Sequence, residues 1–385
     1  MAEDWQSAGF GLYVHWPFCQ AKCPYCDFNS HVTANVDQAR WADAFEREIA
    51  RYGAETDGRV LRSIFFGGGT PSLMEPSTVA RVLSAARSAW PLANDCEITL
   101  EANPTSVEAS RFAGYAQAGV NRVSMGIQAL NDDDLRRLGR LHDVADAMAA
   151  FDVARSHFSR VSFDLIYARQ DQSVAAWRDE LCRALDMAVD HLSLYQLTIE
   201  DGTAFGDRFA AGRLRGLPDE DRAADMWEVT QEVTHEAGFD AYEISNHARS
   251  GAESLHNLIY WNSGDYVGIG PGAHGRLTLG SRRFATETPL APGKWLELVE
   301  TSGNAETLRD EIEPTDRLAE FLMMGLRLVD GIEEERLLRL GGIILINNIN
   351  SLIDLSLLER RAGRIRATAT GRPVLNSVLK EILAD

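Results

Sequence analysis

Short apolar runs alternate with longer amphipathic segments over the first two thirds of the chain. Six runs rich in β-branched and aromatic residues predict strands, at residues 12–16, 63–66, 97–101, 122–127, 161–166 and 191–197. The intervening segments repeat apolar residues with helical spacing, at residues 41–52, 76–90, 107–118, 143–156 and 174–189. This alternation predicts parallel strands joined by right-handed crossovers, in a closed or partial α/β barrel whose site lies at the carboxyl ends of the strands.

The pattern changes after Thr198. We expect a loop with a short helix, a long helix, another strand and glycine-rich turns around a strand, at residues 200–216, 219–237, 241–245 and 264–275. A different unit then follows, with helices predicted at residues 316–329, 333–340, 350–361 and 373–383 and a β-ribbon at residues 365–369. Helices with a two-stranded wing predict a winged-helix-like module, so we divide the chain into residues 1–200, 201–312 and 313–385.

Composition and charge narrow the functional classes. The 385 residues are 45% hydrophobic and 25% charged, which is typical of a globular protein. With 38 basic and 57 acidic residues the net charge is -19, and this argues against nucleic-acid partners because phosphates bind to a positive face. No apolar run is long enough to span a bilayer, and the first residues show no leader pattern. We therefore expect a cytoplasmic protein without a transmembrane segment.

Three of the five cysteines, Cys19, Cys23 and Cys26, form a C-x3-C-x2-C pattern directly after the first predicted strand. An odd, clustered set does not suit a disulfide framework. Three close thiolates without a fourth suit an iron–sulfur cluster with one open iron, while His31, five residues after Cys26, leaves a zinc site as an alternative. The two remaining cysteines, at positions 96 and 182, are expected to be buried side chains.

C-x3-C-x2-C after a first strand resembles the radical S-adenosylmethionine (SAM) superfamily. The resemblance implies a partial (β/α)6 barrel in which the cysteines hold a [4Fe–4S] cluster and the open iron binds SAM. GGGTP, which follows the second predicted strand, is similar to the glycine motif that contacts SAM in the coproporphyrinogen dehydrogenase (HemN) family. By the same resemblance, the SAM contacts are expected at Tyr13, Tyr25, Gly67, Gly68, Gly69, Thr70, Glu101, Gln128, Arg140 and Asp164.

The chemistry of these residue types agrees with a charged nucleotide ligand. Consecutive glycines leave backbone N–H groups free and permit close approach of a ligand. A carboxylate such as Glu101 suits a ribose hydroxyl, and the guanidinium fork of Arg140 suits a carboxylate. Asp164 is a lone acid in an apolar strand and needs a partner.

Two related families share this pattern, and two features separate them. HemN-type dehydrogenases extend the motif to a fourth cysteine, where this chain has Phe28. The string HNLIYW places His256, Asn257, Tyr260 and Trp261 at helical spacing and resembles the HNxxYW signature of the heme chaperone (HemW) family. The resemblance implies that these four residues bind heme, with His256 as a candidate axial ligand, that acceptor apo-hemoproteins receive the heme, and that cluster loading promotes a homodimer.

Two other functions are weighed against the heme chaperone. One is oxygen-independent coproporphyrinogen III dehydrogenase, a radical SAM decarboxylase, which would have to act here without the fourth cysteine. The other is a zinc-stabilised nucleic-acid binder, which the acidity and the presence of only three lysines, Lys22, Lys294 and Lys380, disfavour. Residues 167–172 and 341–350 depart from the family pattern, and the sequence assigns no function to them.

Overall fold

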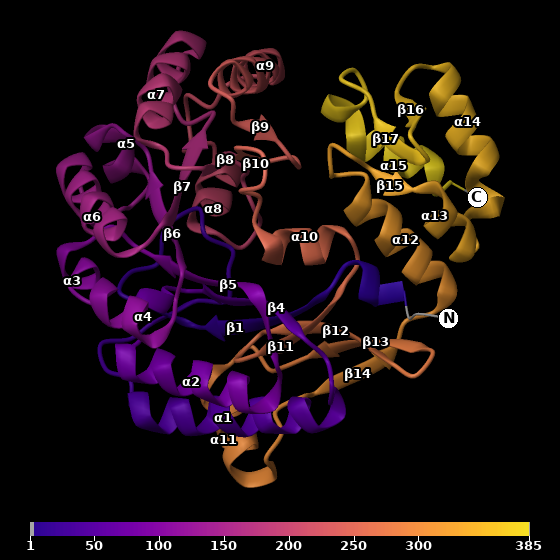
Figure 1. The fold of residues 1–385 in the computed structure, drawn as a ribbon. Helices are drawn as coiled ribbons and strands as arrows, with labels where there is room; N and C mark the ends of the chain where they lie inside the picture. The colour runs from indigo at the N-terminus through magenta and orange to yellow at the C-terminus, as the bar shows by residue number, and fades with distance from the viewer. Residues whose placement is uncertain (1–3, 385) are drawn as a thin grey trace.

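The computed structural model describes residues 4–384 and confirms the predicted barrel strands. Six neighbouring strands run parallel at the centre of a twelve-stranded sheet, in the order β1-β4-β5-β6-β7-β8. They are curved around a common interior (Figure 1), so their carboxyl ends meet on one side. Their bounds are β1 Phe10–Trp16, β4 Leu61–Gly68, β5 Leu92–Ala102, β6 Arg122–Gln128, β7 Arg160–Tyr167 and β8 His191–Gln196.

Helices connect these strands and cover the outer face of the sheet (Figure 1). The helix predicted at residues 107–118 is two helices, because the Arg111 amide bonds to the carbonyl of Glu108, three residues back, and interrupts the helical ladder. The side chain of Arg111 instead donates to the carbonyls of Ser72 and Leu73. The helices are α1 Gln38–Glu55, α2 Pro76–Ala89, α3 Ser106–Ala109, α4 Phe112–Ala118, α5 Asp132–Arg137, α6 Val144–His157 and α7 Val174–Met187.

The middle third of the chain extends the same sheet at both edges. β10 pairs antiparallel with β8, while β11 pairs in parallel with β1 and continues through β12 to β14. The predicted boundary at residue 200 therefore does not coincide with an edge of the sheet, and the division into units stays a prediction. The elements are β9 Asp240–Ala241, β10 Asn246–Ala248, β11 Asp265–Ile269, β12 His274–Leu279, β13 Arg282–Glu287, β14 Leu308–Glu311, α8 Ala204–Ala210, α9 Glu220–Glu236, α10 Leu255–Trp261 and α11 Pro292–Ser302.

The strand predicted at residues 241–245 is wrong. β9 ends at Ala241 and β10 begins at Asn246. Between them the Glu243 carboxylate accepts hydrogen bonds from the backbone amides of Ile244, Ser245 and Asn246. The side chain thus replaces a strand partner for these amides and turns the chain.

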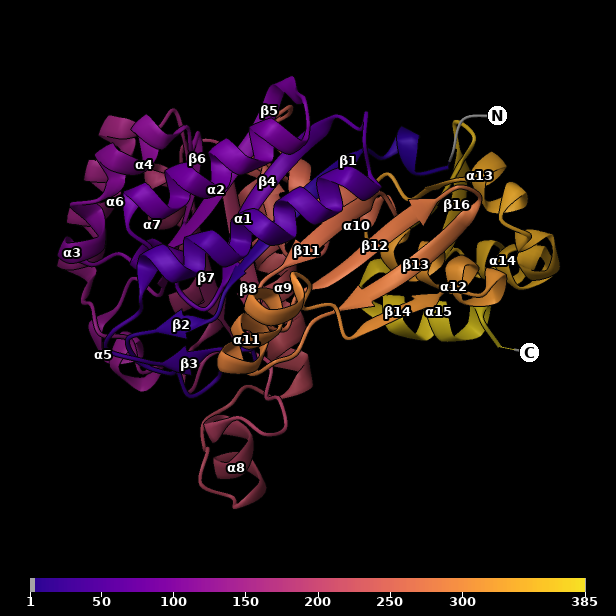
Figure 2. The ribbon, with the colours of Figure 1, turned by 90° about the horizontal axis from the view of Figure 1, so that it is seen from below.

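The C-terminal residues form a separate hydrophobic cluster beside α10 and the ends of β12 and β13 (Figures 1 and 2). A three-stranded sheet, β15-β17-β16, packs with its helices. The helix predicted at residues 350–361 is wrong: α14 ends at Asp354, Ser356 is left-handed (φ 58°), and the chain continues as β16. The elements are α12 Pro314–Gly325, β15 Ile332–Glu333, α13 Glu334–Arg339, η3 Gly342–Leu345, α14 Ile346–Asp354, β16 Leu358–Arg361, β17 Arg364–Ala367, η4 Arg372–Val374 and α15 Leu375–Ile382.

Packing between the barrel and its extension is aromatic. Trp41 on α1 stacks on Trp295 of α11 with ring centroids 5.2 Å apart and planes 7° apart. Both rings are buried in the large core that also holds Phe45. Cys96 is buried as expected, whereas Cys182 is exposed, because the buried face of α7 runs through Trp177, Leu181 and Ala184. No helix among residues 4–384 is long and apolar enough to cross a membrane.

Removal of the Trp295 ring should therefore destabilise barrel and extension together. We expect Trp295→Ala to lower the free energy of unfolding by about 3–5 kcal/mol, because it leaves a large cavity in the core. Phe209, 57% exposed on α8, is the matched control, and Phe209→Ala should change stability by less than about 0.5 kcal/mol. Urea denaturation of the full chain measures both, and equal losses in the two variants would contradict this packing argument.

Candidate functional site

The three clustered cysteines lie on one loop at the carboxyl end of β1. Cys19 ends the short strand β2 (Phe18–Cys19), and Cys23 and Cys26 follow before β3 (His31–Val32). Burial raises the pKa of the Cys19 and Cys26 thiols, so without metal both hold their protons at neutral pH. Because iron binds thiolates, cluster loading must release these protons.

A chain of hydrogen bonds ties this loop to the barrel. Arg140 donates to Cys23 Sγ over 3.4 Å and to the Asn103 side-chain oxygen. Asn103 Nδ2 donates to Thr70 Oγ1 over 3.2 Å, and Thr70 Oγ1 donates to Cys19 Sγ over 3.3 Å. Asn103 was not among the residues predicted from the sequence. Its signal was a polar residue two positions after Glu101 and directly before a proline, just beyond a predicted strand end.

The glycine run that ends β4 is required by close packing. Gly68 has φ +109°, and a Cβ atom there would lie 2.6 Å from the ring of His15. A Cβ at Gly69 would lie 2.8 Å from the Phe18 carbonyl oxygen, and one at Gly67 would lie 2.9 Å from the Tyr13 ring. The run therefore brings the backbone of β4 against β1 and the cysteine loop, where larger residues would clash.

Two carboxyl groups share the barrel interior above these glycines. Glu101, at the end of β5, has its pKa raised to about 8 by burial and by the nearby Asp164, against a hydrogen bond from the Gly68 backbone that lowers it. Burial also raises the pKa of Asp164, on β7, to about 6, although hydrogen bonds from Ser193 and Ser124 lower it. A cationic ligand between the two acids would favour their ionised forms.

Gln128 is strained and incompletely bonded at the end of β6. Its φ is 73°, a left-handed conformation that is rare outside glycine, and the β6–β7 register shifts between Met125 and Gln128. The buried Oε1 of Gln128 and Nε of Arg140 have no hydrogen-bond partner in the described part of the chain. Strain and unpaired buried polar atoms at one place indicate a binding site.

These groups surround one cavity of about 720 Å³, counting the part open to solvent. It brings together most of the predicted cluster and SAM residues: Cys19, Cys23, Cys26, Tyr25, Gly68, Gly69, Thr70, Glu101, Gln128, Arg140 and Asp164, with Asn103 and Ser124 in addition. Gly67 and Tyr13 do not line it; Tyr13 faces a neighbouring cavity. The three thiols at one end of the cavity fit an iron–sulfur cluster. The two acids and the unpaired polar atoms at the other end fit a charged nucleotide.

The described residues offer no ligand set for the alternative zinc site. In the described range, no three His, Cys, Asp or Glu side chains are grouped closely enough to hold a single metal ion. His31 instead bonds to Asn29 Oδ1 over 3.1 Å. A four-iron cluster does not need such convergence, since each thiolate binds a different iron.

The HNxxYW segment forms α10, and its histidine is packed as a core residue. His256 is 2% exposed, with Nδ1 2.8 Å from Ser63 Oγ and Nε2 2.8 Å from Tyr260 Oη. Its ring stacks on Phe65 and Tyr13, and burial lowers its pKa to about 3. Both ring nitrogens are therefore occupied in a neutral imidazole. The expected role of His256 as an axial heme ligand does not fit this conformation.

The other residues of the segment point to different neighbours. Asn257 Nδ2 donates to Tyr242 Oη over 3.3 Å. Trp261 lies beside the C-terminal unit, where the Arg327 guanidinium is 5.9 Å from its ring centroid. Tyr260 lines the cavity that also contains Tyr13. The structure thus does not bring His256, Asn257, Tyr260 and Trp261 to one surface.

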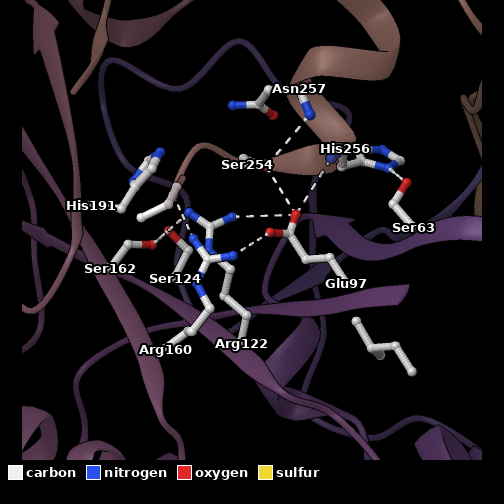
Figure 3. A network of polar contacts seen from close by, with 12 residues as sticks. Ser63, Glu97, Arg122, Ser124, Arg160, Ser162, His191, Ser254, His256 and Asn257 are labelled. Atoms are coloured by element: carbon white, nitrogen blue, oxygen red, sulfur yellow. Dashed lines mark hydrogen bonds and ion pairs between the residues drawn. The ribbon is translucent and has the colours of Figure 1, made fainter. Parts of the chain in front are cut away.

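A buried carboxylate holds the start of α10 against the barrel (Figure 3). Glu97 accepts hydrogen bonds from Ser254 Oγ over 3.1 Å and from the His256 amide over 3.4 Å. Arg160 donates to the same carboxylate over 3.1 Å, and Arg122 Nη1 lies 3.7 Å from it. One acid from β5 therefore joins β6, β7 and the segment that carries His256.

Comparison with known proteins identifies the family. A model of the radical SAM superfamily matches residues 13–177, and a model of the HemN C-terminal domain matches residues 312–374. The chain is 37% identical to the heme chaperone HemW of Escherichia coli, over 97% of this chain and 98% of that protein. The chain belongs to the HemW family of the radical SAM superfamily. Membership in this superfamily implies a [4Fe–4S] cluster and SAM as cofactors.

Other members and a solved structure agree with this placement. The Bacillus subtilis heme chaperone HemW is 30% identical over 97% of this chain and 99% of that protein. A mitochondrial radical S-adenosyl methionine domain-containing protein 1 from Bos taurus is 39% identical over 97% and 87% of the two chains. Coproporphyrinogen III oxidase (HemN) from Escherichia coli shares the fold, with a TM-score of 0.81 at 21% identity over 97% of this chain and 90% of that chain.

The raised pKa of Glu101 predicts a pH-dependent stability of the metal-free protein. In the folded state Glu101 keeps its proton up to about pH 8, whereas in the unfolded chain it loses the proton near its usual pKa of 4.5. The free energy of unfolding therefore falls as the pH rises between these two values. Glu101→Gln removes this loss. We expect the variant to exceed the parent by about 1–3 kcal/mol at pH 8 and to approach it near pH 5.

Denaturant unfolding at several pH values measures this difference. The exposed Asp201→Asn is the charge-matched control and should follow the parent at every pH. A difference between Glu101→Gln and the parent that stays constant from pH 5 to pH 8 would show that Glu101 is not the titrating group.

Loss of the Glu97 carboxylate should release α10. Glu97→Gln leaves Arg122 and Arg160 without their shared acid, and breaking a buried ion pair costs about 3–5 kcal/mol. Hydrogen exchange of the α10 amides should accelerate more than that of α2, which is remote from this network. Uniform acceleration across both helices would contradict a local anchoring role.

Proposed function

We propose that this protein is a heme chaperone, which binds heme and passes it to acceptor apo-hemoproteins. The observation that carries the proposal is the full-length match to proteins named heme chaperone HemW, at 37% identity with the Escherichia coli protein. A match over 97% of this chain includes the cysteine loop, the HNxxYW segment and the C-terminal unit. Phe28 in place of the fourth cysteine of HemN-type dehydrogenases supports the same choice.

In this proposal Cys19, Cys23 and Cys26 hold three corners of the [4Fe–4S] cluster. When bound, the cluster and SAM supply one-electron chemistry. The chain's own groups would bind and orient SAM. Glu101 and Asp164 would attract its positive charge, and Gln128 would accept a hydrogen bond at its unpaired Oε1. Arg140, which donates a hydrogen bond to Cys23 Sγ, would lie between the cysteine loop and the barrel interior. Tyr25, Gly68, Gly69 and Thr70 form the remaining wall, with Tyr13 and Gly67 supporting it from behind.

Cluster binding should also act on the loop itself. Without metal the Cys19 and Cys26 thiols are protonated, and side-chain hydrogen bonds from Thr70 and Arg140 reach the sulfur atoms of Cys19 and Cys23. Bonds from three thiolates to one cluster would fix the whole loop. We propose that this ordered loop is part of the surface through which cluster loading promotes a homodimer and transfer of heme to its acceptor.

The competing function is coproporphyrinogen III dehydrogenase, and an anaerobic comparison separates the two. The cluster-reconstituted protein is mixed with SAM and coproporphyrinogen in one arm, and with ferric heme followed by an apo-hemoprotein in the other. We expect no steady decarboxylation, a stoichiometric heme spectrum, and transfer of heme to the acceptor. Sustained turnover of coproporphyrinogen would instead establish the dehydrogenase.

A cysteine variant shows whether the cluster is held as proposed. Cys19→Ala should lose iron and sulfide on reconstitution, because only two thiolates remain, while Cys182→Ala on the exposed face of α7 should keep the parent's content. Iron and sulfide analysis provides the measurement. Parental cluster content in Cys19→Ala would refute the assignment of the three thiolates.

A further inference from the structure

A second cavity lies beside the cluster and SAM cavity. Counting the part open to solvent, it measures about 1420 Å³, against about 720 Å³ for the cluster and SAM cavity on the same measure. Lys22, Phe28 and Glu101 line both cavities, so the two lie side by side. The second cavity therefore offers a ligand more room than the cluster and SAM cavity does.

The lining of this second cavity combines aromatic and apolar side chains with polar and titratable ones. Tyr260 and Tyr266 form part of the inner wall, with ring centroids 4.3 Å apart. Phe28 and Leu290 line it with 60% and 64% of their surface exposed. Large apolar side chains left open at a cavity mark a binding surface. Titratable groups of both kinds are present too: Lys22, His31 and His274, and the acids Asp27 and Glu101.

His274 is available as a ligand in a way that His256 is not. It begins β12, and its side chain is 57% exposed. Its Nδ1 lies 3.5 Å from Glu287 Oε1, and within residues 4–384 its Nε2 has no hydrogen-bond partner. A carboxylate beside one ring nitrogen orients an imidazole and leaves the other nitrogen free to bind a metal. By contrast, both nitrogens of His256 are hydrogen-bonded.

His256 lies directly behind the cavity wall. Its Nε2 is 2.8 Å from Tyr260 Oη, and its Nδ1 is 2.8 Å from Ser63 Oγ. Ser63 belongs to the central strand β4, so these two bonds fix the Tyr260 phenol relative to the barrel. Loss of His256 would thus disturb the cavity through Tyr260.

We propose that the second cavity is the heme site, that His274 is the axial ligand, and that His256 is a positioning residue for Tyr260. A flat apolar macrocycle matches the aromatic walls, Lys22 can pair with one of its carboxylates, and neutral imidazole is a common ligand of heme iron. This inference rests on the proposed heme-chaperone function. It places the heme beside the SAM cavity, with Phe28 and Lys22 between the two ligands.

Titration of the metal-free full chain with ferric heme tests the ligand. His274→Ala should lose the histidine-ligated Soret spectrum and bind about tenfold or more weakly, and added imidazole should restore the spectrum. The matched control is His235→Ala. His235 lies on the distant helix α9, is also exposed (79%) and is paired with an acid, Asp240. The control should keep the parent's spectrum and affinity.

A second pair of variants tests the positioning role. His256→Ala and Tyr260→Phe should keep a histidine-ligated spectrum and lose affinity to a similar degree, because each removes the same hydrogen bond. Circular dichroism checks that the buried His256→Ala variant is folded, and Tyr260→Phe gives the answer if it is not.

Three results would overturn the inference. If His274→Ala keeps the parent's spectrum and affinity, His274 is not the ligand, although the protein remains a heme chaperone. If Tyr260→Phe binds heme as the parent does, Tyr260 does not need His256 to position it. If the parent itself binds no heme, the proposed function fails together with the inference.

Discussion

The arrangement of the site depends on the pairing of β1 with two parallel neighbours. β1 lies between β4 and β11, with Tyr13 opposite Phe65 on one side and Gly268 on the other. Because all three strands run in one direction, their carboxyl ends bring the cysteine loop, the glycine run and the turn before His274 to one place. A shift of β1 by one residue would turn Tyr13 and His15 away from this place and replace them with Leu12 and Val14.

The cluster and SAM cavity is built in a form that a ligand would stabilise. Burial raises the pKa of both Glu101 and Asp164, and Asp164 raises the pKa of Glu101 further. Gln128 has a left-handed backbone conformation and an unpaired side-chain oxygen. Buried acids and unsatisfied polar atoms cost free energy unless a bound group supplies their missing partners. The rigid sheet holds these groups in place, so binding energy is not spent on bringing them together.

The HNxxYW segment links the larger cavity to the sheet. Glu97 fixes the start of α10 through the Ser254 hydroxyl and the His256 amide, and His256 in turn holds Tyr260 at the wall of the larger cavity. The same segment contacts the C-terminal unit through Trp261 and α12. A change in the position of α10 would therefore reach the barrel, the larger cavity and the C-terminal unit together.

The sequence by itself determined the six parallel strands, the cysteine loop and the identity of most residues around the smaller cavity. The strands and the cysteine loop follow from local spacing, namely β-branched runs and three close cysteines, whereas the SAM contacts at the strand ends follow from the resemblance to the radical SAM superfamily. Only the tertiary structure decided that Asn103 joins Arg140 to Thr70 and that His256 is buried with both nitrogens bonded, because these contacts join strands distant in sequence. Helical spacing alone places His256 and Tyr260 on one face, but it cannot tell whether that face meets a ligand or the core. The packing of α10 on β4 decides that His256 faces the core.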